Sequence, residues 1–517
     1  MGRDVLSRLR GASSEVVLYG LLGMVVLIPL YFSPSFHDYE IPKMVMLKVF
    51  AVLLTLLWVA GMVLRGKITV MDTPLYYTFL AFLAIHFISL FQSYNVFQGL
   101  DTLFQYFCCF LLVIVVFHVV QEERQIRCVA CAMGATGLIV GAIGLLQYND
   151  IVDLHAPWNI PLSTIGNVNY VAEYYDVVFP IAVVLVFVLR SPWLRAGAIV
   201  SCLTMAAHLV VLGSRGGWLG AAVSLSALGA AAALRHFRVG RRVVDVTFTT
   251  IVVAGLGWPV LEGLTSGIQI GPERTLGSVA AENWQRMMGR TEDALKLQDD
   301  SSQQRVLLWE DTLRLIFERP LVGVGVGNFE YNIPHHMGRE TLEVKMRMEE
   351  RQGRELMAYR AHNEYLEVWA ETGILGFGVF CYLLYQILAA IFVQLKRYAR
   401  GEGNLLSIGF GAAILASLAH SFFSTNLQDP VSASHFWIVV GMVWSLKLKA
   451  EGETQVGLMA AESKRGMRIL LAGCGLVLAL AVALGVQTLL GAYHYHRGHL
   501  LFREGQYRAT AMEMDRA

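Results

Sequence analysis

Apolar stretches of about 20 residues recur along nearly the whole chain, and short polar segments separate them. Each stretch is long enough for an α-helix to cross the hydrocarbon core of a bilayer. A membrane β-barrel would instead show segments of about ten residues in which apolar and polar positions alternate. The pattern therefore predicts an all-α polytopic membrane protein with about 12 to 13 transmembrane helices.

The expected spans are about thirteen in number. They lie near residues 16–33, 43–64, 74–93, 100–120, 127–147, 168–189, 194–212, 217–234, 243–262, 373–395, 405–423, 432–446 and 469–491. Composition agrees with this pattern, because 55% of the 517 residues are hydrophobic and only 16% are charged. A soluble protein carries about 25% charged residues. The net charge of +1 gives no indication of nucleic-acid binding.

Lysine and arginine are distributed unequally between the two sides of the predicted membrane domain. The basic segments "RHFRVGRR" (235–242) and "KRYAR" (396–400) lie in connections on one side, whereas the short connections on the other side carry only Arg215. Cytoplasmic loops of membrane proteins are enriched in basic residues. We therefore expect a cytoplasmic N-terminus and place Arg215 on the outer side.

One connection, residues 263–372, is long and polar, and it falls on the outer side. It contains an apolar stripe at helical spacing, which Pro320 ends. The stripe consists of Val306, Trp309, Leu313 and Ile316. Residues 340–360 form a second expected helix, in which acidic and basic residues are three or four positions apart. The connection is therefore expected to be a mostly helical periplasmic or extracellular loop.

The spans and connections divide the chain into five expected parts. These are a membrane core of about nine spans (1–262), the large loop (263–372), three more core spans (373–447), a cytoplasmic loop with an extra span (448–492) and a final helical part (493–517). The final part is similar to the start of a tetratricopeptide helix pair, and one such repeat cannot bury its own apolar face. This indicates further repeats or a protein partner. Within this part we interpret His494, His496 and His499 as interface residues rather than as a metal site.

Arg215 is the first candidate for a functional role. It lies in "GSRGGWLG" at the outer end of a span, where a charged side chain is unfavourable unless it has a use. Gly216 and Gly217 allow a ligand to come close to the backbone, and the next helix begins there with its positive dipole end. We favour a phosphate site. The alternative is an arginine that extends to lipid phosphates.

The glycines in "ERPLVGVGVGNF" (318–329) invite comparison with a nucleotide-binding loop. Their spacing is not GxGxxG, they follow a helix rather than a strand, and they lie outside the cytoplasm. We interpret Gly323, Gly325 and Gly327 as positions that permit close packing in a tight loop.

"RAHNEYLEVWAETGILG" (360–376) concentrates titratable groups just ahead of an apolar span. His362 is either a general base at the membrane interface or a side chain that caps the helix or bridges to a glutamate, and spacing leaves both open. We expect the glutamates around it to be solvated or supporting groups and Trp369 to be an interfacial anchor. These glutamates are Glu364, Glu367 and Glu371.

Metal catalysis is not expected. The loop contains no HExxH motif or comparable ligand set, and His335 and His336 are adjacent, so they cannot share one helix face.

Three segments together carry a resemblance. "GSRGGWLG" at a span end, then "RVLLWEDTLRLIFERPLVGVGVGNF", then "RAHNEYLEVWAETGILGFGVF" resemble, in order and topology, the O-antigen ligase and polymerase superfamily of bacterial inner-membrane glycosyltransferases. The resemblance covers about residues 16–446, which hold twelve expected spans, the usual number for the ligases. The extra span and the tetratricopeptide-like part depart from a minimal ligase, so the acceptor is not restricted to the lipopolysaccharide core.

The resemblance implies a reaction and its residues. A glycan on undecaprenyl diphosphate would be transferred, without cofactor, metal or nucleotide sugar, to an acceptor hydroxyl at the periplasmic face. The acceptor would be the lipid A core, another glycan or a protein. By correspondence of motifs, Arg215 and Arg305 would bind the diphosphate and His362 would take the proton of the acceptor, with Arg360 and Glu364 in support.

Other functions compete with ligation. A polymerase would use the same donor and a similar basic site, so the sequence does not separate the two. A transporter or flippase would have broken helices in paired repeats and charges at mid-membrane. The main intramembrane charges here are Glu173 and Asp176, near the outer end of a span, and Glu173 is a candidate to line the acceptor path. A receptor or scaffold would not need Arg215, Arg305 and His362 together.

Overall fold

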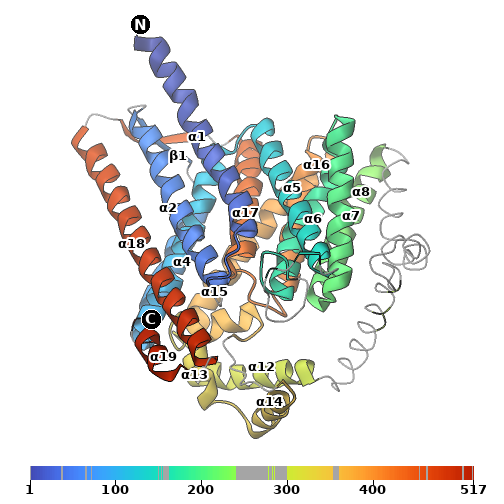
Figure 1. Ribbon diagram of the computed structural model, residues 1–517. Helices are drawn as coiled ribbons and strands as arrows, with labels where there is room; N and C mark the ends of the chain where they lie inside the picture. The colour runs from blue at the N-terminus through green and yellow to red at the C-terminus, as the bar shows by residue number, and fades with distance from the viewer. Residues whose placement is uncertain are drawn as a thin grey trace. The chain divides into compact units, whose positions relative to one another are not determined.

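Apolar helices dominate the computed structural model of the chain (Figure 1). It describes residues 2–36, 39–64, 67–71, 73–148, 151–152, 154, 162–239, 278, 282, 285, 300–352, 360–452, 455–460, 464–503, 506–514 and 516. Within these ranges ten helices are long and apolar enough to cross a membrane, and Ser14–Leu30 and Leu405–His420 are shorter apolar helices. Together they correspond to every expected span except 243–262, which lies outside the described residues. The prediction of an all-α polytopic membrane protein is confirmed.

The chain forms two compact units that are each discontinuous in sequence. The first comprises residues 1–72, 108–208 and 429–517, and the second comprises 73–107 and 209–428. Two of the four boundaries between them fall within helices, namely α4 (Val96–Val119) and α7 (Pro192–Leu212).

In the first unit, α2 packs against α1 and α18, α5 packs against α1 and α6, and α17 packs against α6. The bounds of these helices are α1 Gly2–Leu30, α2 Glu40–Leu64, α5 Glu123–Tyr148, α6 Val168–Val188, α17 Pro430–Glu451 and α18 Lys464–Arg503. Helix α19 (Tyr507–Met514) packs on α18, where His494 Nδ1 is 2.7 Å from Glu513 Oε2. The expected helix pair at the C-terminal end is therefore present, and its relation to tetratricopeptide repeats stays a prediction.

The first unit also contains a two-stranded antiparallel ribbon that the helical pattern did not predict. Strand β1 (Lys67–Met71) pairs with β2 (Gln455–Ala460), with Lys67 opposite Ala460 and Met71 opposite Gln455. β1 reads "KITVM", and its three central β-branched residues favour a strand. The pairing joins segments that are almost 400 positions apart, which is why local pattern gave no sign of it.

In the second unit, α8 packs against α16 and α15, α15 packs against α3, and α12 packs against α14 and α15. The bounds of these elements are α3 Pro74–Ser89, η1 Leu90–Gln92, α8 Arg215–Val239, α12 Asp300–Glu318, α13 Phe329–Asn332, η2 Ile333–His335, α14 Arg339–Gln352, α15 Glu364–Arg400 and α16 Leu405–His420. Helix α12 runs crosswise to α8 (Figure 1). The expected helix at 340–360 is thus α14 in its first part, and residues 353–359 lie outside the described residues.

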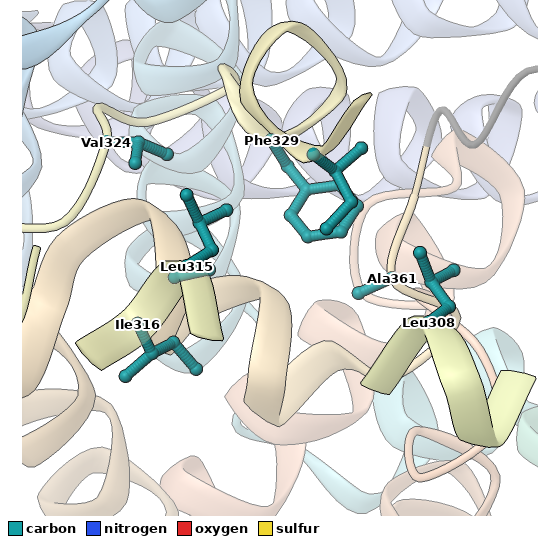
Figure 2. Packing of buried hydrophobic residues seen from close by; sticks show 8 residues of the cluster. Leu308, Leu315, Ile316, Val324, Phe329 and Ala361 are labelled. Atoms are coloured by element: carbon teal, nitrogen blue, oxygen red, sulfur yellow. The ribbon is translucent and has the colours of Figure 1, made fainter. Parts of the chain in front are cut away.

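The described part of the large loop packs around a small apolar cluster (Figure 2). From α12 the cluster takes Leu308, Leu315 and Ile316, and from the segments that follow it takes Val324 and Phe329, among others. The predicted stripe was only partly right, because Leu308 is buried whereas Val306 is half-buried.

A polar contact on the buried face of α12 accounts for the difference between the predicted and the observed buried positions. Asp311 is buried and accepts hydrogen bonds from Thr341 Oγ1 at 2.5 Å and from the Gly338 N–H at 3.1 Å. The inner face of α12 therefore includes a carboxylate that binds the start of α14, and the apolar positions flank it.

Candidate active site

Helix α8 begins at Arg215, at the point where the sequence predicted an anion site. Ser214 precedes the helix and caps it, since its Oγ accepts the Gly217 N–H at 3.4 Å. The half-buried Arg215 side chain extends away from its own helix and donates from Nη1 to Ser302 Oγ at 3.1 Å. The arginine of the first motif thus contacts the helix that carries the second motif.

Helix α12 links this arginine to the third motif. Arg305 lies one turn after Ser302, and Trp309 lies one turn further on. The Trp309 Nε1–H donates to the Ala361 carbonyl oxygen at 3.0 Å, directly before His362. One helix therefore contacts Arg215 near its start and the backbone of the histidine segment two turns later.

His362 has an unusual backbone conformation. Its φ is +48°, in the left-handed region that residues other than glycine rarely adopt. Asn363 follows and caps the next helix by accepting the Leu366 N–H at 3.1 Å. The side chain of His362 itself reaches solvent. The sequence left open whether His362 is a general base or a group that caps the helix or bridges to a glutamate. The residue that caps the helix is Asn363.

The charge around His362 is positive. Although His362 is exposed at the surface, protein packed around its imidazole desolvates it, and this desolvation, together with the positive charges of Arg305 and Arg360, lowers the pKa of His362 from 6.5 to about 4. The imidazole is therefore neutral near pH 7 and has a lone pair available. Arg305 and Arg360 therefore lie close enough to His362 to lower its pKa, and Arg215 is linked to the helix of Arg305 through Ser302.

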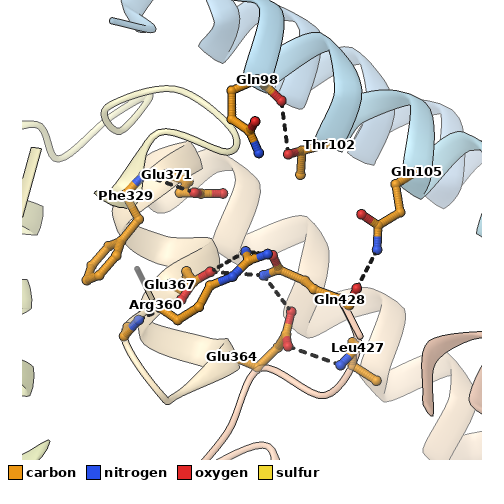
Figure 3. Close-up of polar contacts among 11 residues, drawn as sticks. Gln98, Thr102, Gln105, Phe329, Arg360, Glu364, Glu367, Glu371, Leu427 and Gln428 are labelled. Atoms are coloured by element: carbon orange, nitrogen blue, oxygen red, sulfur yellow. Dashed lines mark hydrogen bonds and ion pairs between the residues drawn. The ribbon is translucent and has the colours of Figure 1, made fainter. Parts of the chain in front are cut away.

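The three glutamates of the third motif are buried, and the expectation that they are solvated was wrong (Figure 3). Glu367 accepts from Arg360 Nη1 at 3.0 Å and from the Ala361 N–H at 2.7 Å. Glu364 accepts from the Leu427 N–H at 3.3 Å. A buried carboxylate is stable only when such donors surround it. The alternative interpretation, that glutamates of this motif are supporting groups, agrees with the contacts of Glu364 and Glu367.

Gln428 lies at the centre of this network, and sequence reasoning missed it. Its Nε2 donates to both Glu364 Oε1 and Glu367 Oε1, its Oε1 accepts from Arg360 Nη1, and its backbone oxygen accepts from Gln105 Nε2 at 2.7 Å (Figure 3). An amide can serve a carboxylate and a guanidinium at the same time because it both donates and accepts. No local signal marks Gln428, which is more than 60 positions away from Glu364 and Glu367.

The glycine loop is tightly packed, as predicted, and its packing partner is the third motif. Gly323, Gly325 and Gly327 all have positive φ, and a Cβ at Gly323 would lie 2.3 Å from the Glu371 carbonyl carbon. The Gly325 N–H donates to the Glu371 carbonyl oxygen at 3.0 Å, and the Glu371 carboxylate accepts the Phe329 N–H at 3.2 Å. The interpretation of a tight packing loop is confirmed.

Two of the candidate binding residues have packing roles in the second unit. A Cβ at Gly216 would lie 2.1 Å from Nε2 of the buried His420 on α16, so glycine permits close contact between α8 and α16. The N–H of Gly217 already donates to Ser214. Glu173 belongs to the first unit, where it is buried on α6 beside Tyr174. A binding role for Gly216, Gly217 and Glu173 stays a prediction.

Among the described residues, no group of three or more His, Cys, Asp or Glu side chains is arranged to hold a metal ion.

Comparison with known proteins agrees with the motifs. Residues 200–381 match the family model described as O-antigen ligase. This range contains Arg215, Arg305, Arg360 and His362. No curated protein matches the chain.

Proposed function

This chain carries an O-antigen ligase domain and belongs to the O-antigen ligase superfamily of membrane glycosyltransferases, and from that premise we propose that it transfers a glycan from undecaprenyl diphosphate to an acceptor hydroxyl. The observation that carries the proposal is a neutral histidine beside the positive charges of Arg305 and Arg360, on a segment that α12 links to Arg215. Arg215 reaches α12 through Ser302, and Arg305 on the same helix acts on His362.

In the proposed reaction, the acceptor oxygen attacks the anomeric carbon of the glycan. The bond between that carbon and the diphosphate oxygen breaks, and undecaprenyl diphosphate leaves with the electron pair. The hydroxyl proton passes to an imidazole nitrogen of His362. Arg215 and Arg305 stabilise the negative charge that develops on the leaving diphosphate, since a guanidinium keeps its charge and matches phosphate oxygens in two-pronged geometry.

Arg360 and Glu364 support the site in this proposal. Arg360 adds positive charge beside His362 and is held by Glu367. Glu364 binds the backbone of Leu427 and the side chain of Gln428, which in turn contacts Arg360. The lipid tail of the donor would remain in the bilayer, with its diphosphate at the height of the lipid headgroups.

We further propose that the site faces the periplasm of a bacterial inner membrane, with the N-terminus in the cytoplasm. The acceptor is the lipid A core, another glycan or a protein, and the helix pair α18–α19 is a candidate contact for a protein partner. A polymerase is the second possibility, because it would use the same donor and the same charges.

The decisive experiment incubates the purified protein in lipid nanodiscs with an undecaprenyl-diphosphate-linked glycan and candidate acceptors. A ligase is expected to release undecaprenyl diphosphate and form a capped acceptor, whereas a polymerase would lengthen the lipid-linked glycan. Arg215→Ala, Arg305→Ala and His362→Ala should each lower turnover by about 100-fold or more, in line with the loss of a charge stabiliser or general base. Wild-type turnover by all three variants, in correctly inserted protein, would refute the site assignment.

A further inference from the structure

Glu367 is fully buried, with an exposed fraction of 0%, and its two carboxylate oxygens hold two different parts of the same segment. Oε1 accepts from Arg360 Nη1 at 3.0 Å, and Oε2 accepts from the Ala361 N–H at 2.7 Å. Both donors directly precede His362 in the chain. The carboxylate therefore fixes the approach to the histidine through one side chain and one peptide group (Figure 3).

The backbone on both sides of His362 is held by hydrogen bonds. The Ala361 carbonyl oxygen accepts from Trp309 Nε1, so both polar atoms of that residue's backbone have partners. After His362, the Glu364 N–H donates to the carbonyl oxygens of Ser421 and Ser424, at 2.9 and 3.1 Å. A left-handed histidine persists only where its surroundings over-determine it, and these contacts supply that constraint.

Resting on the proposed function, we propose that Glu367 is a positioning residue that acts through His362. By holding Arg360 and Ala361, its carboxylate keeps the imidazole in the orientation needed to accept the proton of the acceptor hydroxyl. Without Glu367, the segment can relax toward an ordinary backbone conformation and carry the imidazole away from that position. Displacements of about 1 Å in a reacting group are enough to lower a rate by about 100-fold.

Glu371 offers a matched control on the same helix. It is also a buried glutamate, with an exposed fraction of 2%, and it also accepts a backbone N–H. That N–H belongs to Phe329 in the large loop rather than to the segment before His362. The two carboxylates therefore lie on the same helix and are both buried. They differ in their donors, because Glu367 binds the segment before His362 and Glu371 binds the large loop.

The test compares Glu367→Gln with Glu371→Gln in full-length protein in nanodiscs, with undecaprenyl-diphosphate-linked glycan as donor. The amide keeps the shape of the side chain but replaces one acceptor oxygen by a donor, so it cannot accept from both Arg360 and Ala361. For Glu367→Gln we expect kcat to fall by about 10-fold or more while the donor KM changes by less than about 2-fold, because the diphosphate contacts remain. Glu371→Gln should keep kcat within about 3-fold of wild type.

A double variant separates positioning from general destabilisation. If Glu367 acts through His362, then Glu367→Gln combined with His362→Ala should turn over no more slowly than His362→Ala alone. Should Glu367→Gln fail to fold, Trp309→Phe tests the same idea from the other side, since it removes the donor to the Ala361 carbonyl oxygen. It should show the same split, a lower kcat with an unchanged donor KM.

The outcomes distinguish the two proposals. A wild-type kcat for Glu367→Gln, or a further loss when it is added to His362→Ala, would overturn the positioning role and leave the proposed function standing. Full activity of His362→Ala would overturn the proposed function, and the positioning role with it.

Discussion

His362 is less basic in the free protein than a histidine in water, and this bears on its proposed role. Its pKa is lowered to about 4 by desolvation and by the positive charges of Arg305 and Arg360. A general base works best when its pKa is near the working pH. The proposed donor would bring a diphosphate, whose negative charge would offset the arginines and raise the pKa of His362. The base would therefore become effective only when the donor is bound.

This argument predicts a difference between two pH profiles. The acid limb of kcat/KM reports the free protein and should lie near pH 4, because protonation of His362 below its pKa of about 4 removes the base. The acid limb of kcat reports the donor complex and should lie at higher pH. Both would be measured by release of undecaprenyl diphosphate between pH 3.5 and 8, with the melting temperature followed in parallel to separate titration from unfolding. Two coincident limbs near pH 6.5 would contradict the argument.

At the scale of elements, the break in α15 explains how the third motif meets the membrane span. Gly373 has φ +64° and ψ −168°, so the helix stops at residue 372 and restarts at once. Pro320 and the residues after it supply the missing partners, since the Ile374 N–H donates to the Pro320 carbonyl oxygen at 2.8 Å and the Val324 N–H donates to that of Ala370 at 3.0 Å. Broken helices are tolerated in membrane proteins where other backbone satisfies the freed groups. The part of α15 before Gly373, which carries the three glutamates of the third motif and is called the site helix below, is thereby held by the glycine loop.

Gly373→Ala should therefore destabilise the protein. The backbone conformation is open almost only to glycine, at a cost of order 1–3 kcal/mol for another residue. A Cβ would also lie 2.3 Å from the backbone of Leu321. We expect a melting temperature several degrees lower, measured in detergent by intrinsic fluorescence.

The control for this substitution is Gly378→Ala, in the regular part of the same helix. A Cβ there meets nothing within 4 Å. Alanine is favoured over glycine inside a helix by about 1 kcal/mol, so this variant should melt at or slightly above the wild-type temperature. Equal melting temperatures for the two variants would argue against a required break at Gly373.

At the scale of the whole molecule, the proposed reaction depends on which side of the membrane the site occupies. The segment "KRYAR" at the end of α15 is basic, and basic loops stay in the cytoplasm. The site helix lies at the other end of α15, as does α12, which packs against it. An active site at the periplasmic face follows from these two facts under the proposed orientation.

A pair of single cysteines in a cysteine-free background tests the orientation. Glu340 on α14 and Glu402 after α15 are both exposed glutamates, so each substitution by cysteine is expected to be harmless. A membrane-impermeant maleimide applied to the periplasmic side should label Glu340→Cys and leave Glu402→Cys unlabelled until the membrane is permeabilised. The reverse labelling pattern would invert the topology and refute the periplasmic site.

Periodicity alone was enough to predict the membrane class and the spans, because apolar length is a local property of the chain. That Arg215, Arg305 and His362 belong to one site was implied only by the resemblance of the three motifs. The tight packing of the glycine loop was also predictable, since glycine permits close backbone approach and positive φ, and its spacing and position did not fit a nucleotide-binding loop. The tertiary structure decided what distant residues contribute. It buried Glu364, Glu367 and Glu371, and it brought Gln428 into contact with Glu364 and Glu367. It also placed Ser302 and Trp309 as links from α12 to Arg215 and to the His362 segment. From the sequence alone a charged residue is expected to be solvated, because the partners that would allow its burial lie elsewhere in the chain. Only folding shows that those partners offset the loss of water.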